Sequence, residues 1–284
     1  GYMETALRAY NNLAVELPAE ENERRLECFE KGFELAKKVG YLSLQSWIGS
    51  VLSWAYVGVG NLNKAVLLAE ESVALDRKAG NITHLPSSLD FLGYVYQVLG
   101  EWDKSEHCYN EAFSISQRLK DFQHIAGVHG FLGGFHFDKG EYAKAREFFE
   151  KMYEVYEKAG AKYFQMERSQ YLIWTYIELG EIEKANNLID SLYKFALEKK
   201  DKLLVATADV LRAMLFRAEK RWEESIEYFE KSVREMEALG ARRWDVYSFA
   251  RMLYEYARVY LERDQEGDRE KADKLLNQAL EIFQ

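Results

Sequence analysis

The chain has 284 residues, of which 48% are hydrophobic and 30% charged, and it contains only two prolines. This balance is typical of a folded, largely helical protein and excludes a disordered one. The 38 basic and 47 acidic residues leave a net charge of -9, so we predict no nucleic-acid partner. No apolar run reaches the ~18 residues of a membrane span, so we predict no membrane partner and a cytoplasmic location.

Glycine recurs at a fixed interval along the chain. Gly60, Gly100, Gly140 and Gly180 lie 40 residues apart, and further glycines mark the half-way points of the same grid, at Gly40, Gly80, Gly160 and Gly240. Apolar residues between the glycines recur at helical spacing, so each 40-residue unit predicts two helices. Glycine ends a helix cheaply in the left-handed conformation. Where it is missing, at Lys120, Lys200 and Lys220, we expect the turn to persist at a small cost.

In chain order, the predicted two-helix units cover residues 3–40, 41–80, 81–120, 121–160, 161–200, 201–240 and 241–284. The first is irregular around Pro18 and the last is extended at Glu262 to Asp268, so both are interpreted as end units. We expect one domain over residues 1–284, and a fragment of a larger protein, since the helical pattern continues to the last residue. Cys28 and Cys108 are two units apart, too far for a disulfide, and should be reduced and half-buried.

A motif within the units identifies a resemblance. Leu89-x2-Leu92-Gly93-x2-Tyr96 is followed by Ser105-x3-Tyr109-x2-Ala112, and related copies surround Tyr56, His136 and Tyr176. This resembles the tetratricopeptide repeat, which has a small residue and then an aromatic in the first helix, and alanine and an aromatic in the second. Arg212 replaces a leucine of the pattern, and the family's closing proline is absent throughout.

The resemblance implies an all-α, right-handed superhelical solenoid of about seven helix-turn-helix repeats. The usual unit has about 34 residues, so the longer unit is similar to sensor domains of signal-transduction ATPases with numerous domains (STAND) and to bacterial peptide-pheromone regulators. The resemblance further implies a non-enzymatic sensor that binds a peptide, protein or small molecule in its concave groove. Its effector would be an ATPase domain of the same full-length chain. The alternative is a free-standing adaptor that holds two proteins together.

The first helix of each pair is expected to line the groove. A row of mostly aromatic residues precedes the expected core row by two positions, which rotates it about 200° around the helix and away from the core. This groove row is Trp54, Tyr94, Gly134, Trp174, Met214 and Tyr254, and the core row is Tyr56, Tyr96, His136, Tyr176, Phe216 and Tyr256. Exposed aromatic rings are suited to binding a partner. Alternatively, they fill space between neighbouring first helices.

Three glycines interrupt the first helix of the fourth unit. Gly127, Gly130 and Gly134 fall at its groove-facing positions, although each interior glycine costs about 1 kcal/mol against alanine. One interpretation is a ligand pocket at this place, flanked by Tyr94, Phe137 and Trp174. The other is that large neighbours such as Phe91 and Tyr171 need the room.

Polar residues at groove positions change character along the chain. They are Asp90, Gln97, Glu167, Gln170, Glu178, Arg217, Arg251 and Arg258. The acidic ones precede the arginines, a gradient that would suit an extended bipolar ligand such as a peptide. The groove set predicted to bind the ligand is Trp54, Tyr94, Gly127, Gly130, Gly134, Phe137, Trp174, Glu178, Arg217, Tyr254 and Arg258.

Catalytic and metal-binding patterns are weak. The glycines at 127–134 lack the Lys-Ser/Thr pair of a phosphate loop. His129 and His136 could share a helix face, but no carboxylate or cysteine completes a metal shell. We therefore predict no catalysis, metal or cofactor. Recurrent lysines that precede a small residue are interpreted as a solvated outer face; they are Lys64, Lys104, Lys144, Lys184 and Lys271.

Overall fold

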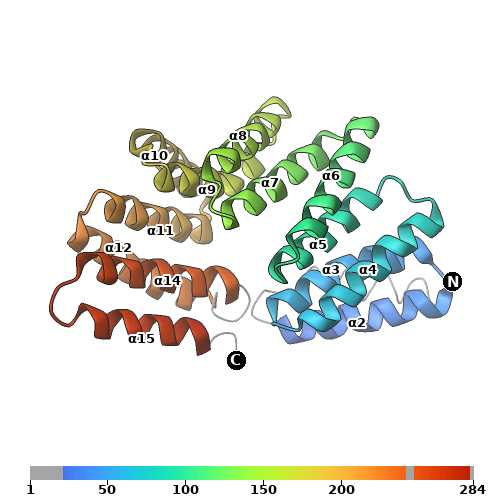
Figure 1. Ribbon diagram of the computed structural model, residues 1–284, viewed down its shortest axis with the longest axis horizontal. Helices are drawn as coiled ribbons and strands as arrows, with labels where there is room; N and C mark the ends of the chain where they lie inside the picture. The colour runs from blue at the N-terminus through green and yellow to red at the C-terminus, as the bar shows by residue number, and fades with distance from the viewer. Residues whose placement is uncertain (1–21, 241–245, 282–284) are drawn as a thin grey trace. The chain divides into compact units, whose positions relative to one another are not determined.

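The computed structural model describes residues 22–240 and 246–281, and every element in these ranges is an α-helix or a turn. The helices follow one another as antiparallel hairpins (Figure 1). Their bounds are α2 Asn22–Val39, α3 Leu42–Gly58, α4 Leu62–Ala79, α5 Leu85–Val98, α6 Trp102–Leu119, α7 Phe122–Asp138, α8 Tyr142–Lys158, α9 Lys162–Glu178, α10 Ile182–Lys199, α11 Lys202–Ala218, α12 Trp222–Ala238, α14 Val246–Arg263 and α15 Asp268–Glu281. The all-α prediction is confirmed over this part of the chain. Pro18 and the start of the last predicted unit lie outside the described residues.

The second helices recur at the interval of the glycine grid. The second helices α4, α6, α8, α10 and α12 begin at Leu62, Trp102, Tyr142, Ile182 and Trp222, every 40 residues. The first helices α3, α5, α7, α9 and α11 end two residues before a position of the glycine grid: Gly100 after α5 has a φ of +76°. Lys120 and Lys200 adopt the same left-handed conformation, with φ of +56° and +55°, so the prediction that these turns persist without glycine is confirmed.

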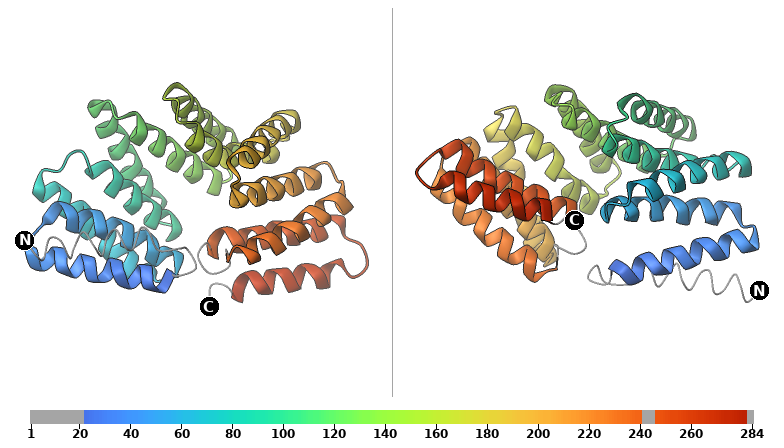
Figure 2. Two further views of the ribbon diagram at one scale, coloured as in Figure 1. Left: turned by 180° about the vertical axis from the view of Figure 1, so that it is seen from behind. Right: turned by 60° about the horizontal axis from the view of Figure 1, so that its bottom comes forward.

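The chain divides into two compact units, residues 1–135 and 136–284, with the boundary inside α7. In the first unit α3 packs on α4 and α5 packs on α6, and the first helices α3 and α5 also contact each other. In the second unit α9, α11 and α14 are the first helices, paired with α10, α12 and α15, and α11 contacts both α9 and α14. Figure 2 shows the same hairpins from two other sides. The prediction of one continuous domain stays a prediction.

Small residues let the two helices of a hairpin approach. One position early in the second helices α4, α6, α8, α10, α12 and α15 is alanine or serine and is fully buried: Ala65, Ser105, Ala145, Ala185, Ser225 and Ala272. Gly93 plays the same part in α5, because a Cβ there would lie 2.6 Å from Cε1 of Tyr109. Cys28 and Cys108 are free and buried, more deeply than predicted. No helix in the described ranges is long and apolar enough to cross a membrane.

The core aromatic row joins consecutive hairpins. Tyr56, His136, Tyr176 and Tyr256 are buried, and Tyr96 and Phe216 are half-buried. Each tyrosine of the row donates a hydrogen bond to a glutamate 26 residues earlier, on the preceding second helix; the pairs are Tyr56–Glu30, Tyr96–Glu70, Tyr176–Glu150 and Tyr256–Glu230. A buried ring with a polar tip therefore ties one repeat to the next.

Candidate functional site

The end of α7 and the first helices of the second unit bring five of the predicted residues together. Phe137 lies near the end of α7, Trp174 and Glu178 lie on α9, Arg217 lies on α11, and Arg258 lies on α14. Four further residues complete the group, Asp138, Arg251, Glu255 and Glu262. We call these nine residues the ring-and-ion cluster.

The aromatic part of the cluster holds an arginine. The rings of Phe137 and Trp174 have centroids 5.4 Å apart and are tilted by 59°. The guanidinium of Arg251 lies 3.7 Å from the Trp174 ring centroid and 5.2 Å from that of Phe137, both within cation–π range. Arg251 Nη1 is 3.9 Å from Oδ1 of Asp138, too far for a hydrogen bond. Tyr142 extends the aromatic wall, with its ring centroid 5.0 Å from that of Phe137.

The ionic part is a closed network of two arginines and three glutamates. Arg217 Nη1 donates to Glu262 at 2.5 Å, and its Nη2 lies 3.4 Å from Glu255 and 3.5 Å from Glu178. Arg258 Nη1 lies 3.1 Å from both Glu178 and Glu255, and its Nη2 is 3.4 Å from Glu262. Glu178 and Arg258 are 80 residues apart, so this pair joins α9 to α14.

Burial sets the electrostatics of this network. Arg217 and Glu255 are both only 4% exposed. Burial raises the pKa of Glu255 even though Arg258 and Arg217 oppose the shift. Burial alone would lower the pKa of Arg258, but the carboxylates of Glu255 and Glu178 raise it. Arg258 is thus held in its charged form beside these carboxylates.

The other predicted residues of the second unit behave differently. Tyr254 is 49% exposed, as a groove residue should be, but no ring or ion contact joins it to the cluster among the described residues. Met214 is only 1% exposed, so its predicted place in the groove row is wrong. The physical reason is that α11 contacts first helices on both sides, α9 and α14, and a side chain turned away from its own partner helix is still covered.

In the first unit, the predicted groove residues lie on three helices, α3, α5 and α7. Trp54 is 53% exposed on α3, and the Tyr94 ring on α5 lies 6.5 Å from the Phe131 ring on α7. Gly127, Gly130 and Gly134 are half-buried on α7. A Cβ at Gly127 or Gly134 would meet no atom within 4 Å, so at these two positions no neighbour needs the room. The pocket flanked by Phe137 and Trp174 would draw on both units and stays a prediction.

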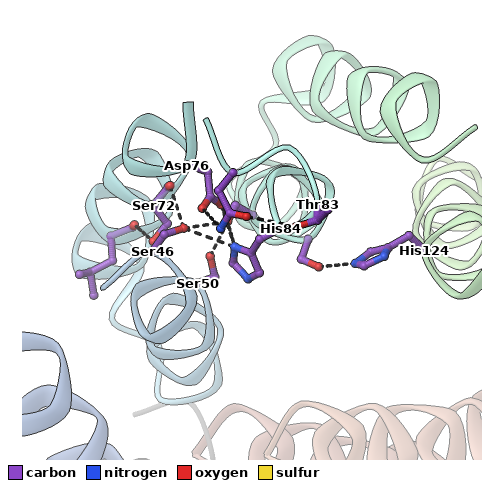
Figure 3. Close-up of polar contacts among 11 residues, drawn as sticks. Ser46, Ser50, Ser72, Asp76, Thr83, His84 and His124 are labelled. Atoms are coloured by element: carbon purple, nitrogen blue, oxygen red, sulfur yellow. Dashed lines mark hydrogen bonds and ion pairs between the residues drawn. The ribbon is translucent and has the colours of Figure 1, made fainter. Parts of the chain in front are cut away.

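A polar network in the first unit was not predicted. Asp76 on α4 is fully buried and accepts hydrogen bonds from Ser88 at 2.7 Å and Asn81 at 3.0 Å, and it lies 2.8 Å from Nδ1 of His84. Figure 3 shows Asp76 and His84 facing each other, with Ser46 and Ser50 of α3 beside them. These contacts join α3, α4 and α5, so the network fixes how neighbouring hairpins pack.

A second polar chain joins two neighbouring first helices. Ser87 Oγ on α5 is 2.6 Å from His124 Nε2 on α7, and His124 Nδ1 is 2.7 Å from Asp121 Oδ2 (Figure 3 labels His124). Asp121 also accepts the backbone N–H groups of Gln123 and His124, which makes it the N-cap of α7. No group of three or more possible metal ligands occurs in the described ranges.

Some members of the ring-and-ion cluster could have been found from the sequence. Arg251, Glu255, Arg258 and Glu262 are spaced by four, three and four residues, which places them on one face of a helix. Arg251 and Arg258 were both predicted at groove positions, and the alternating charges at this spacing would have added Glu255 and Glu262. Asp138 and Tyr142 carry no such pattern, because they flank a turn.

Comparisons with known proteins agree with this architecture. Residues 85–158 match the tetratricopeptide repeat family. No curated protein sequence matches the chain. Among solved structures, the apo form of RapI is similar with a TM-score of 0.77 at 13% identity, over 99% of this chain and 97% of RapI. At these identities the similarity shows the fold alone.

Two further solved structures are similar over almost the whole chain. The Rap conjugation gene regulator of the plasmid pLS20, solved in complex with the Phr* peptide, has a TM-score of 0.77 at 14% identity, over 99% of this chain and 75% of the regulator. A STAND protein with a tetratricopeptide repeat sensor from Pyrococcus horikoshii has a TM-score of 0.67 at 15% identity, over 98% of this chain and 40% of that protein. The chain is therefore a helical repeat protein with a tetratricopeptide-like fold.

Proposed function

We propose that this chain is a non-enzymatic recognition domain that binds a peptide through the ring-and-ion cluster. The observation that carries the proposal is the gathering of half-buried aromatic rings with charged groups on the first helices α9, α11 and α14 and the end of α7. Rings supply contact area and charges supply orientation, which is the composition of binding hot spots.

The nature of the ligand is supported by the structural relatives. The Rap regulator of pLS20 was solved with a bound peptide, and another Rap protein, 13% identical to this chain, was solved with Competence and Sporulation Factor. The backbone and side chains of a peptide present both positive and negative groups. A site in which acidic and basic side chains lie close together is therefore suited to a peptide.

The effector of this recognition domain is proposed from the STAND relative. That protein joins a tetratricopeptide repeat sensor to an ATPase. We place the present chain in the same role, as a cytoplasmic sensor of the long, 40-residue-repeat type whose bound ligand regulates an attached ATPase domain. The alternative is a free-standing adaptor, for which full-length protein would bind two proteins at once without any change in ATPase rate.

The proposal is tested by selecting random 12-residue peptides from a phage library on the immobilised chain. A selected peptide is then synthesised, and its Kd is measured by fluorescence anisotropy. Trp174→Ala should weaken binding by roughly 10–100-fold, because central aromatic anchors dominate binding energy. Phe122→Ala removes an aromatic ring that is 66% exposed on α7 and should leave the affinity unchanged. Equal affinities of the wild-type protein and a folded Trp174→Ala variant would contradict the proposal.

A further inference from the structure

The position of Arg251 is unlike that of the other two arginines in the cluster. Arg217 and Arg258 each contact three glutamates. The guanidinium of Arg251 lies 3.7 Å from the Trp174 ring centroid, and the single carboxylate within ion-pair range in the described residues is Asp138, at 3.9 Å. Its side chain is 26% exposed. Arg251 is thus held by ring faces and one loose ion pair, which are contacts that another guanidinium could make equally well.

The surroundings of Arg251 have the chemistry of a guanidinium receptor. Two ring faces and a carboxylate attract a planar cation, and tryptophan is the strongest ring partner. The cluster contains four carboxylates, Asp138, Glu178, Glu255 and Glu262, and three guanidiniums, so its formal charge is 3 - 4 = -1. Carboxylates thus outnumber guanidiniums among these nine residues.

We infer that Phe137, Trp174 and Asp138 form a binding site for the guanidinium of a ligand arginine, and that Arg251 occupies this site in the free protein. The inference rests on the proposed function and adds to it the chemistry of the ligand: a peptide with an arginine side chain. Because Arg251 competes for the site, it lowers the apparent affinity for the ligand. Entry of the ligand arginine releases Arg251 from the rings.

The test uses two neutral-ended probes, N-acetyl-arginine methylamide and the uncharged N-acetyl-citrulline methylamide, with binding measured by isothermal titration calorimetry. Arg251→Ala vacates the site and should bind the arginine probe at least about tenfold more tightly than the wild-type protein does. The affinity for the citrulline probe should be the same for Arg251→Ala and the wild-type protein. Adding Trp174→Ala to Arg251→Ala should abolish the gain.

Arg269→Ala is the matched control, because it removes the same charge from an arginine whose side chain is 84% exposed on α15. It should bind both probes as the wild-type protein does. Arg251→Gln repeats the test with less loss of volume, should Arg251→Ala fail to fold. No gain in either variant, or an equal gain for the citrulline probe, would overturn the inference.

A second measurement separates this inference from the proposed function. Replacing arginine by citrulline in a selected peptide should weaken its binding to the wild-type protein at least about tenfold. A peptide that needs Trp174 but tolerates citrulline leaves the proposed function intact and overturns the guanidinium site. If no peptide binds but Arg251→Ala takes up the arginine probe, the site is upheld and the proposed function fails.

Discussion

At the scale of single residues, Gly93 and Gly127 have the same helical backbone but opposite reasons to be glycine. A Cβ at Gly93 would enter the space of the Tyr109 ring, at 2.6 Å from Cε1, whereas one at Gly127 meets no atom within 4 Å. Gly93→Ala should lower the free energy of unfolding by about 1–3 kcal/mol through overpacking. Gly127→Ala should raise it by about 1 kcal/mol through helix propensity. Urea unfolding of both variants checks the pair, and a destabilising Gly127→Ala would show that the position is not empty.

A buried carboxylate makes stability depend on pH. Burial raises the pKa of Asp76, but hydrogen bonds with His84, Ser88 and Ser46 outweigh it and the pKa lies below its ordinary value of 3.8. The stabilisation is therefore complete above pH 3.8 and is lost as the pH falls through the lower native pKa. Asp76→Asn should lower the free energy of unfolding by about 1.5–3 kcal/mol at pH 7 and by less at pH 3.

The measurement is urea unfolding of the wild-type protein and Asp76→Asn at the two pH values. Asp273→Asn, at an exposed position of α15, is the control for the chemical change and should cost little at either pH. A penalty for Asp76→Asn that is the same at pH 3 and pH 7 would contradict the account.

At the scale of elements, local pattern predicted the hairpins and their turns well, because glycine spacing and helical periodicity are properties of short segments. The recurrent lysines were interpreted only as a solvated outer face, and this interpretation is incomplete. The ammonium groups of Lys64, Lys104 and Lys184 lie 4.8, 5.3 and 5.3 Å from the ring centroids of the core-row tyrosines, so these lysines also cover the rings. The periodicity of a single helix could not predict this lysine–ring contact, because the ring lies on the partner helix.

In the buried ionic network between α9, α11 and α14, we expect the contributions of Arg217 and Glu255 to stability to depend on each other. Arg217→Ala should lower the free energy of unfolding by about 3–5 kcal/mol, because it leaves the carboxylate of Glu255 buried beside fewer cations. Adding Glu255→Gln should recover part of that loss, which a double-mutant cycle measures. Strictly additive effects of the two substitutions would show that Arg217 and Glu255 do not depend on each other.

At the scale of the whole molecule, the repeat predicted which helices are first helices, and the residues Phe137, Trp174, Glu178, Arg217 and Arg258 of the candidate site follow from that assignment. What the repeat could not predict is pairing over long separations. Glu178 and Arg258 meet because α9, α11 and α14 stand side by side, and the angles between such helices depend on packing at every interface. For the same reason Met214 is buried instead of facing outward.

The central claim is that a peptide binds at Trp174. The most direct measurement is fluorine NMR of protein labelled with 5-fluorotryptophan, which reports each of the six tryptophans separately once single substitutions to phenylalanine assign them. On addition of a selected peptide, the Trp174 resonance should shift or broaden, while that of Trp222, on the second helix α12, should stay in place. A peptide that saturates the protein and leaves the Trp174 resonance unchanged would contradict the claim.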